Sequence, residues 1–331
     1  MQEITREMLI DKAVELMDAG IVSSVLAWKR GEFDYDVTPA VFSDPDELRA
    51  ELVWNGFCSA NLSKYLVKKL EKLEGKLLVF LKPCDTYSFN QLLTEHRFDR
   101  EKVYAVGVQC GGMVDIGRVK AACGEGIDKV SFDGDKLTVT NLYDESFTVD
   151  MNDALAERCV NCKSKKHVAY DELLGKEGEV IDSNRFDEVE KIEKMTADER
   201  FAFWQSQLSK CIRCNACRDA CPACTCEKCV FDNPLSGVEN KSPANSFEEK
   251  LFHIIRAYHV AGRCTDCGEC SRVCPQNIPL HLLNRKFIKD INSFYGEYQA
   301  GAEEGSRAPL VDYTLNDIEP GSVFDGGDKN A

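Results

Sequence analysis

The sequence predicts an α/β domain in the N-terminal half and an α-helical domain towards the C-terminus. Short, wholly apolar runs at Leu77–Leu81 and Val103–Val108 are typical of parallel strands that are covered on both faces. Apolar residues at helical spacing precede and separate these runs. A duplicated cysteine motif, flanked by further helical patterns, occupies the last third of the chain.

The first 150 residues alternate between helical and strand-like patterns. Strand-like residues flank Asp133–Asp135 within Val130–Thr140, and this pattern predicts a β-hairpin appended to the parallel sheet. The other expected elements are a helix with an apolar stripe at Leu9, Ala13, Leu16 and Met17, a strand at Ile21–Trp28, a helix at Asn61–Leu73, a strand at Leu77–Leu81, a crossover helix at Thr86–Glu95 and a strand at Val103–Val108.

Composition divides the chain into four expected regions. Residues 1–162 form the α/β domain, and residues 163–200 form a charged surface linker with one or two solvated helices. Residues 201–298 form the α-helical domain. Residues 299–331 are polar and Gly-rich, so we expect an extended tail that orders only against a partner.

Charge and cysteine content exclude several classes of function. The 17 cysteines follow an acidic, amphipathic N-terminus that does not resemble a secretion signal, so they indicate metal ligands rather than disulfides. The net charge of −15 argues against a nucleic-acid partner. No apolar run approaches the ~20 residues needed to cross a bilayer, so we expect no membrane association and a cytoplasmic location.

The duplicated motif has the spacing Cys-x2-Cys-x2-Cys-x3-Cys-Pro, which is the bacterial ferredoxin pattern for 4Fe–4S clusters. In proteins with two clusters, the cysteine before proline normally ligates the other cluster. Zinc is the alternative, but structural zinc sites normally use paired Cys-x2-Cys units. We therefore expect two 4Fe–4S clusters, one held by Cys211, Cys214, Cys217 and Cys274 and the other by Cys264, Cys267, Cys270 and Cys221.

Helical patterns at Phe201–Leu208, Ser246–Ala261 and Leu280–Ile291 bracket the two motifs. They predict an α-helical dicluster ferredoxin domain rather than a small βαβ ferredoxin. The expected apolar face of the middle helix consists of Leu251, Ile254, Ile255 and Tyr258.

Four other cysteines form a candidate third 4Fe–4S site. Cys84 and Cys110 each follow a predicted parallel strand, and the carboxyl ends of such strands line the crevice where ligands bind. Cys159 and Cys162 form a Cys-x2-Cys pair after the hairpin. The alternatives are ordinary buried cysteines, or a zinc site that includes His167, although a lone histidine in a Lys-rich stretch is expected to be exposed.

Three more cysteines extend the first motif, and their role stays open. They could bind another metal if Cys58 or Cys123 supplied a fourth ligand, or they could be packing thiols. These cysteines are Cys224, Cys226 and Cys229.

The segments LKPCDTYSF and VYAVGVQCGGM resemble a signature of the beta subunits of deazaflavin-reducing hydrogenases and formate dehydrogenases. The segments KCIRCNACRDACPACTC and GRCTDCGECSRVCP are similar to dicluster proteins such as the cluster-bearing subunit of anaerobic sulfite reductase and heterodisulfide-reductase-associated proteins. The resemblance covers roughly residues 77–115 and 201–290. The chain differs from the hydrogenase beta subunits in that its dicluster region follows the α/β domain.

The resemblance implies electron relay between a flavin-bearing partner and a redox enzyme. The partners that it implies are a flavoprotein, a hydrogenase, a formate dehydrogenase or a heterodisulfide-reductase-like subunit. The beta subunits can bind FAD and a deazaflavin, but this sequence has no Gly-x-Gly-x-x-Gly turn. We predict a non-catalytic electron-transfer subunit of an anaerobic multi-subunit oxidoreductase, without catalytic residues. The alternative is a flavin-dependent reductase that binds FAD and itself oxidises a deazaflavin or nicotinamide cofactor, with its active site at the Cys84/Cys110 crevice. A regulatory cluster sensor is a weaker alternative, because a sensor needs only one labile cluster.

Overall fold

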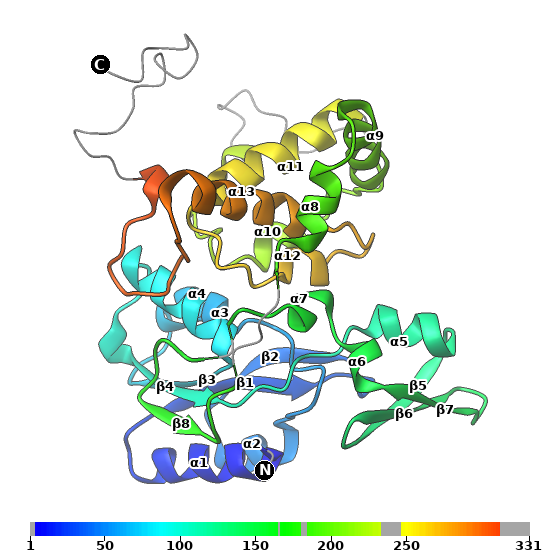
Figure 1. Cartoon of the computed structure of the whole chain (residues 1–331). Coiled ribbons are helices and arrows are strands. Elements are labelled where there is room, and N and C mark those ends of the chain that lie inside the picture. The colour runs from blue at the N-terminus through cyan, green and yellow to red at the C-terminus, as the bar shows by residue number, and fades with distance from the viewer. Residues whose placement is uncertain (1–3, 165, 180–183, 233–245, 312–331) are drawn as a thin grey trace.

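The computed structural model describes residues 4–164, 166–179, 184–232 and 246–311. The sheet of its N-terminal half has five strands in the order β2-β1-β3-β4-β8 (Figure 1). β2 pairs with β1 in the antiparallel sense, and the other neighbouring strands are parallel. The predicted parallel sheet is therefore present, with one antiparallel edge. The strands are β1 (Ser24–Arg30), β2 (Val37–Phe42), β3 (Leu77–Leu81), β4 (Val103–Val108) and β8 (Glu172–Leu174).

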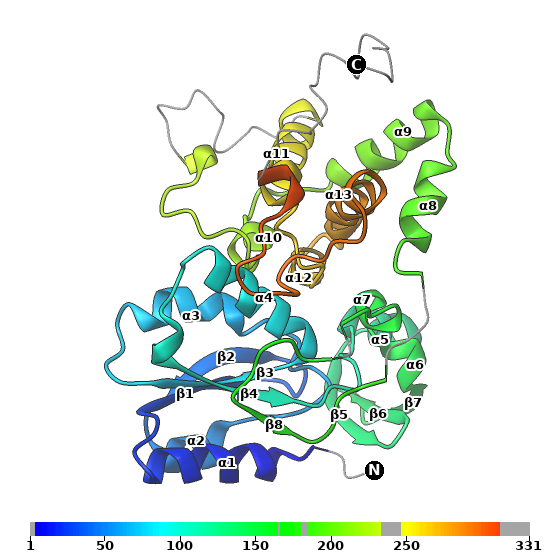
Figure 2. The same cartoon turned by 60° about the vertical axis from the view of Figure 1, so that its left-hand side comes forward.

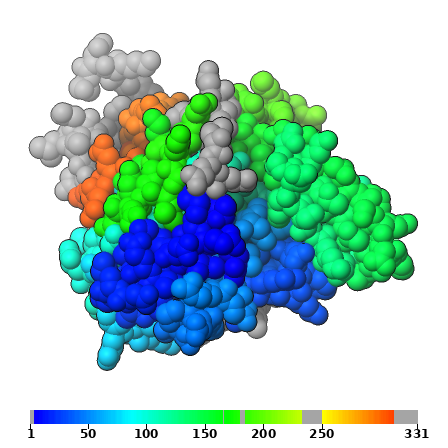
Figure 3. All heavy atoms as spheres, turned by 90° about the horizontal axis from the view of Figure 1, so that it is seen from below, coloured from blue at the N-terminus to red at the C-terminus, as the bar shows by residue number. Residues whose placement is uncertain are grey.

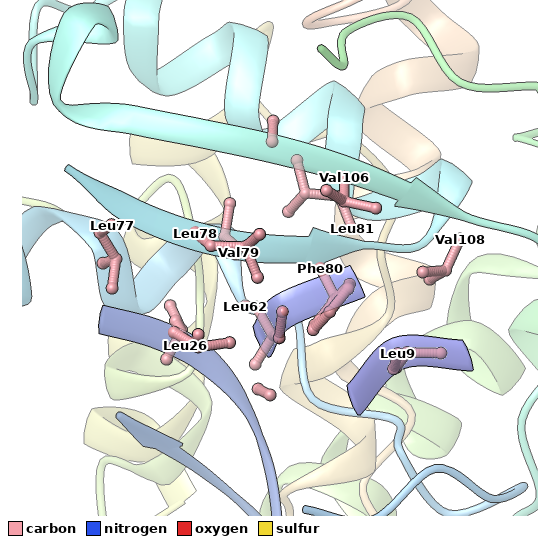
Figure 4. Close-up of a cluster of buried hydrophobic side chains, with 14 of the residues drawn as sticks. Leu9, Leu26, Leu62, Leu77, Leu78, Val79, Phe80, Leu81, Val106 and Val108 are labelled. Carbon is pink, nitrogen blue, oxygen red and sulfur yellow. The ribbon is translucent and has the colours of Figure 1, made fainter. Parts of the chain in front are cut away.

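Helices cover both faces of this sheet. α1 (Arg6–Asp18) and α2 (Pro45–Glu51) lie on one face, and α3 (Ser63–Leu70) and α4 (Pro83–Thr94) lie on the other (Figures 1 and 2). Figure 3 shows α1 and α2 as the blue surface of the underside. Because both faces are covered, every residue of β3 is buried. The core joins Leu9, Leu26, Phe80 and Val106 across these layers (Figure 4).

A second, antiparallel sheet lies beside the first and contains the predicted hairpin. β5 (Ile127–Asp133) and β6 (Lys136–Asn141) form this hairpin, and β7 (Ser146–Asp150) adds a third strand that the sequence analysis did not predict. α5 (Ile116–Cys123) and α6 (Met151–Ala154) flank the sheet (Figure 1). Its apolar residues form a separate hydrophobic cluster.

The charged segment 163–200 differs from the expected surface linker, because it contributes β8 to the edge of the main sheet. Asp171 helps to fix this strand, since its carboxylate accepts a hydrogen bond from the backbone N–H of Ala105 at 2.7 Å. After β8 the segment contains the expected helices, α8 (Asp187–Glu193) and the start of α9 (Ala197–Leu208).

α10 (Ala216–Asp219) and α12 (Glu269–Arg272) lie above α3 and α4, and α8 and α9 lie to one side of them (Figure 2). The predicted helices around the cysteine motifs are present as α9, α11 (Ser246–Val260) and α13 (Leu280–Tyr295), but α11 does not bury the expected face. Leu251, Ile254 and Tyr258 are exposed, whereas His253 and Arg256 are buried. The helices and 3-10 turns not yet named are α7 (Glu157–Val160), η1 (Arg100–Lys102), η2 (Val230–Asp232) and η4 (Pro309–Val311).

Polar contacts join the sheet half to the helical half. The hydroxyls of Ser88 on α4 and Thr265 lie 2.8 Å apart, and both side chains are buried. Arg263 forms a two-pronged ion pair with Glu95, with N–O distances of 2.7 and 2.6 Å. Two-pronged pairs of this kind fix orientation as well as distance.

Residues 299–311 differ from the extended arm expected from the sequence. Ala300 and Ala308 are buried, and Gly301 lies against α4. A Cβ at Gly301 would lie 1.9 Å from the carbonyl oxygen of Tyr87, so only glycine fits this contact. The rest of the expected tail, residues 312–331, lies outside the described residues. Within the described part of the chain, no helix combines the length and apolarity needed to span a bilayer.

Candidate metal centres

The two cysteine motifs fold into loops with the same backbone conformation. In each loop, the second and fourth residues after the first cysteine have left-handed backbone conformations. They are Arg213 (φ 54°) and Asn215 (φ 62°) in the first loop, and Asp266 (φ 60°) and Gly268 (φ 68°) in the second. Left-handed backbone is uncommon outside glycine. Such alternation turns successive backbone N–H groups inward, into a concavity that suits anions and Fe–S clusters. One of these groups, the Arg213 N–H, donates to Cys211 Sγ at 3.4 Å.

One cavity collects cysteines from both motifs. Three cysteines of the first motif line it together with the last cysteine of the second motif, in the crossed arrangement expected from the sequence. We name this set the first site; it consists of Cys211, Cys214, Cys217 and Cys274.

The complementary set is also grouped. Burial is the main reason that the pKa values of Cys264, Cys267 and Cys270 are raised, and the negative charge of Cys221 raises each of them further. Cys221 therefore lies beside the three cysteines of the other motif. We name this set the second site; it consists of Cys221, Cys264, Cys267 and Cys270.

The ligands of both sets are thiols. Soft thiolate ligands select Zn, Cu(I) or Fe–S clusters. Across residues 4–164, 166–179, 184–232 and 246–311, no three His, Cys, Asp or Glu side chains are grouped as ligands of one metal ion. The four thiols that line the cavity of the first site match the number of cysteine ligands of a 4Fe–4S cluster.

The third candidate site lies at the carboxyl edge of the main sheet. Cys84 is the second residue of α4, directly after β3, and Cys110 follows β4. Cys159 lies on α7, and Cys162 follows it. All four side chains line a single cavity, so the structure brings together the cysteines that the sequence grouped. We name this set the third site.

Backbone donors also face the third site. The N–H of Gly112 donates to Cys110 Sγ, and the N–H of Met113 donates to Cys159 Sγ, both at 3.4 Å. Gly112 adopts φ 114°, and a Cβ there would lie 2.7 Å from the side chain of Leu155. This glycine therefore lets the chain turn close to the thiols.

The lining of the third site is mainly cationic. Its cavity is lined by five cationic side chains, namely Lys82, Arg158, Lys163, Arg185 and Arg285. Among the residues that the structure describes, one acidic side chain lines the same cavity. That residue is Asp266. A four-iron cluster with four thiolate ligands carries net negative charge, so this lining suits it.

Lys82 is the most deeply buried of these cations, with 1% of its side chain exposed. Its Nζ lies 2.9 Å from Asp85 Oδ2, donates to the Ala60 carbonyl at 2.9 Å and lies 4.5 Å from the Trp28 ring centroid. Burial alone would lower the pKa of Lys82, but the charges of Asp85 and Cys84 outweigh it and raise the pKa. The ammonium group therefore stays charged.

The prediction that His167 is exposed is wrong. Its imidazole is buried beneath the main sheet's carboxyl edge, where Nε2 lies 3.1 Å from the Leu81 carbonyl oxygen and 3.2 Å from that of Val108. Nδ1 lies 2.9 Å from Glu177 Oε2. The histidine is buried because it bridges the last residues of β3 and β4, and it does not line the cavity of the third site.

The other cysteines do not form one group. Cys224, Cys226 and Cys229 line a separate cavity together with His259. Neither proposed fourth ligand lies there: Cys58 is buried in the main core, and Cys123 packs against the hairpin cluster.

Two residues that face the cysteine motifs were missed by the sequence analysis, namely His253 and Arg256 on α11. His253 lines the cavity of the first site, and Arg256 donates to the carbonyl oxygen of Cys217 at 2.8 Å. Their spacing of three residues on one helix was the available signal. The periodicity of Leu251, Ile254, Ile255 and Tyr258 outweighed this signal, because it predicts that the opposite face of the helix is buried.

The fold and the cysteine sites define an iron–sulfur protein with a dicluster region. Residues 207–278 match the family model described as "4Fe-4S dicluster domain", which indicates two 4Fe–4S clusters. The chain is 26% identical over 333 residues to the F420-dependent formate dehydrogenase subunit beta of Methanocaldococcus jannaschii, covering 83% of this chain and 86% of that protein. It is 24% identical to the F420-dependent formate dehydrogenase 1 subunit beta of Methanococcus maripaludis, covering 87% of this chain and 89% of that protein.

Among solved structures, a chain of the F420-reducing [NiFe] hydrogenase complex from Methanosarcina barkeri matches with 12% identity and a TM-score of 0.36. The match covers 47% of this chain and 59% of that chain. The two formate dehydrogenase relatives and the dicluster model confirm the resemblance that the sequence motifs indicated.

Proposed function

We propose that this chain is a non-catalytic electron-transfer subunit of a multi-subunit oxidoreductase complex. In this proposal the first, second and third sites each hold one 4Fe–4S cluster. When bound, such clusters accept and release single electrons at potentials tuned by charge, hydrogen bonds and solvent exposure. The residues of the chain hold the thiolates in position, exclude water and supply the surrounding charge.

One observation carries the proposal. The cavity that is lined by the four cysteines of the third site is also lined by Cys267 of the second site. The first site contains Cys274 from the second motif, and the second site contains Cys221 from the first motif. The three sites therefore adjoin in series, with the second site in the middle, and this is the arrangement that a relay requires.

The relatives support the assignment to a complex, because their names describe beta subunits of formate dehydrogenases. We infer that the partners are a flavoprotein, a hydrogenase, a formate dehydrogenase or a heterodisulfide-reductase-like subunit. All 17 cysteines are free thiols in the structure, and thiols in metal-ligand spacing favour a reducing, cytoplasmic location.

The test is the metal content of the full chain purified without oxygen. Three filled sites correspond to about twelve iron atoms per chain, and the dicluster region alone corresponds to about eight. The visible absorbance should bleach with dithionite. A colourless protein that contains zinc in place of iron would contradict the proposal.

A second candidate function is a flavin-dependent reductase. A cavity between the hairpin sheet and the helical half is lined by the aromatic rings of Tyr35 and Phe57 and by the cations Arg158 and Arg272. Aromatic walls with a few polar groups are typical of sites for flat organic cofactors. Stoichiometric flavin absorbance in the isolated chain would favour this function, and a flavin-free chain with full iron content would favour the relay.

A further inference from the structure

α11 buries two polar side chains among apolar ones on the side that faces the cysteine motifs. The exposed fractions are 2% for His253 and 4% for Arg256, and Phe252, Ala257 and Val260 are buried beside them. A buried polar side chain normally has a hydrogen-bond partner. The two polar residues on this otherwise apolar face therefore need partners on the cysteine side.

His253 has no hydrogen-bond partner for either ring nitrogen in the part of the chain that the structure describes. An imidazole ring carries at least one N–H donor in either tautomer. A buried donor without a partner is rare in native proteins and points to a bound group that is not a protein side chain.

The cavity that His253 lines is the first site, and its composition limits what that group can be. The lining contains the four thiols of the site and, among the described residues, no carboxylate. The amide side chains of Asn215 and Gln276 also line the cavity, but neither forms a hydrogen bond with the His253 ring. The four thiols are the remaining side-chain acceptors in this lining. Arg256, one turn further along α11, donates to the carbonyl of Cys217, which holds a cysteine of the first site beside the same helix face.

We propose that the ring N–H of His253 donates a hydrogen bond to a sulfur atom of the 4Fe–4S cluster in the first site and thereby raises the reduction potential of that cluster. The inference rests on the proposed function, because it requires a cluster in this cavity. Reduction adds one negative charge to the cluster, and a donor to its sulfur atoms stabilises the reduced form more than the oxidised form. His253 is thus a positioning residue that separates the potential of the first site from that of the second.

The test compares three variants of the full chain, purified without oxygen and titrated with dithionite while electron paramagnetic resonance is recorded. In His253→Phe the potential of one cluster should shift downward while the other signals keep their potentials. His253→Gln supplies an amide N–H and should restore part of the shift. His259→Phe is the matched control, because His259 is exposed on the same helix and lines a different cavity.

Pulsed resonance with 15N-labelled histidine gives an independent readout. The wild-type cluster should show a coupling to a histidine nitrogen that is missing in His253→Gln. Unchanged potentials in His253→Phe at full iron content would overturn the inference, and so would the absence of this coupling in the wild type. If His253→Phe loses four irons, its potentials are not informative and the nitrogen coupling becomes the test. A coupling that is present in the wild type and missing in His253→Gln then supports the inference, and its absence from the wild type contradicts it. A wild-type chain that lacks the dicluster iron would instead contradict the proposed function.

Discussion

Arg158 donates a hydrogen bond from Nη1 to the backbone carbonyl oxygen of Cys267, at 2.7 Å. The same nitrogen lies 2.7 Å from Glu269 Oε1, and Nη2 donates to the Ser59 carbonyl at 3.3 Å. Arg158 directly precedes Cys159 of the third site, whereas Cys267 belongs to the second site. One buried guanidinium therefore joins the backbone of the second site to α7, the helix that carries Cys159 of the third site.

Replacing this guanidinium should destabilise the junction between the two sites. In Arg158→Met the Cys267 carbonyl loses this donor, and Arg272 remains as the one charged partner of Glu269 among the residues that the structure describes. We expect the free energy of unfolding to fall by about 3 kcal/mol, since removing one partner of a buried pair leaves an uncompensated charge. The measurement is thermal unfolding of the oxygen-free, iron-loaded protein.

Lys163→Met is the control for Arg158→Met. Lys163 also lies near the third site, but its ion pair with Glu297 is exposed, with an N–O distance of 2.8 Å. Exposed pairs contribute about 1 kcal/mol or less. Equal unfolding temperatures for the two variants would contradict the role of Arg158 at the junction.

Removing one thiol of the third site should remove that cluster alone. We expect Cys110→Ser to lose about four of about twelve iron atoms. The resonance signals of the dicluster region should persist, because its ligands lie on other loops. Cys123→Ser is the control, since Cys123 packs against the hairpin, and it should keep all the iron. Unchanged iron in Cys110→Ser would remove the third cluster from the proposal.

The crossed grouping of cysteines predicts which cluster each proline-linked cysteine serves. Cys221→Ala should perturb the signal of the second site, although Cys221 belongs to the first motif. Cys274→Ala should perturb the signal of the first site. The measurement is electron paramagnetic resonance of the reduced variants. If each substitution affects the cluster of its own motif, the crossed assignment is wrong.

His167→Ala should weaken the edge of the main sheet without changing the iron content. The substitution leaves the Leu81 and Val108 carbonyls without the imidazole, and unsatisfied buried groups cost about 1–3 kcal/mol. Denaturant unfolding measures the loss. His96→Asn serves as the control, because His96 is exposed and asparagine tolerates its φ of 51°. A loss of iron in His167→Ala would instead favour a ligand role for His167.

The isolated chain should exchange electrons with artificial dyes but should show no turnover with NADH, NADPH, formate or hydrogen. Its clusters transfer single electrons, and the sequence shows no nicotinamide-binding fingerprint. Dye reduction with each donor is measured for the isolated chain and for a complex purified from anaerobic cells. Rapid turnover of the isolated chain with a physiological donor would replace the relay by the reductase.

The sequence alone determined the features that depend on local spacing. The strands at Leu77–Leu81 and Val103–Val108 have the predicted bounds, because an uninterrupted apolar run fits a strand that is buried on both faces. The two cysteine motifs likewise indicate two 4Fe–4S clusters, and residues 207–278 match the corresponding family model. Ligand spacing within one tight loop is a local property, so it can be read from the chain.

The tertiary structure decided the features that depend on distant partners. β8 is a strand because β4 offers a free edge to a short charged segment, and no pattern within that segment indicates this pairing. His167 is buried because two strand ends place their carbonyls around it. Only the folded chain shows that Cys267 lines the cavity of the third site, since these residues lie on separate loops.

The orientation of α11 shows the same limit most clearly. Hydrophobic periodicity predicts that Ile254 and Tyr258 face inward, because burial of apolar surface normally dominates the orientation of a helix. In the structure the opposite face is buried, where Phe252, Ala257 and Val260 pack together with His253 and Arg256. His253 lines the cavity of the first site and Arg256 donates to the Cys217 carbonyl, so both polar groups lie against the cysteine motif. Hydrophobic periodicity reflects the preference of each side chain for water or for an apolar environment. Only the fold determines which protein groups a buried polar side chain contacts in place of water.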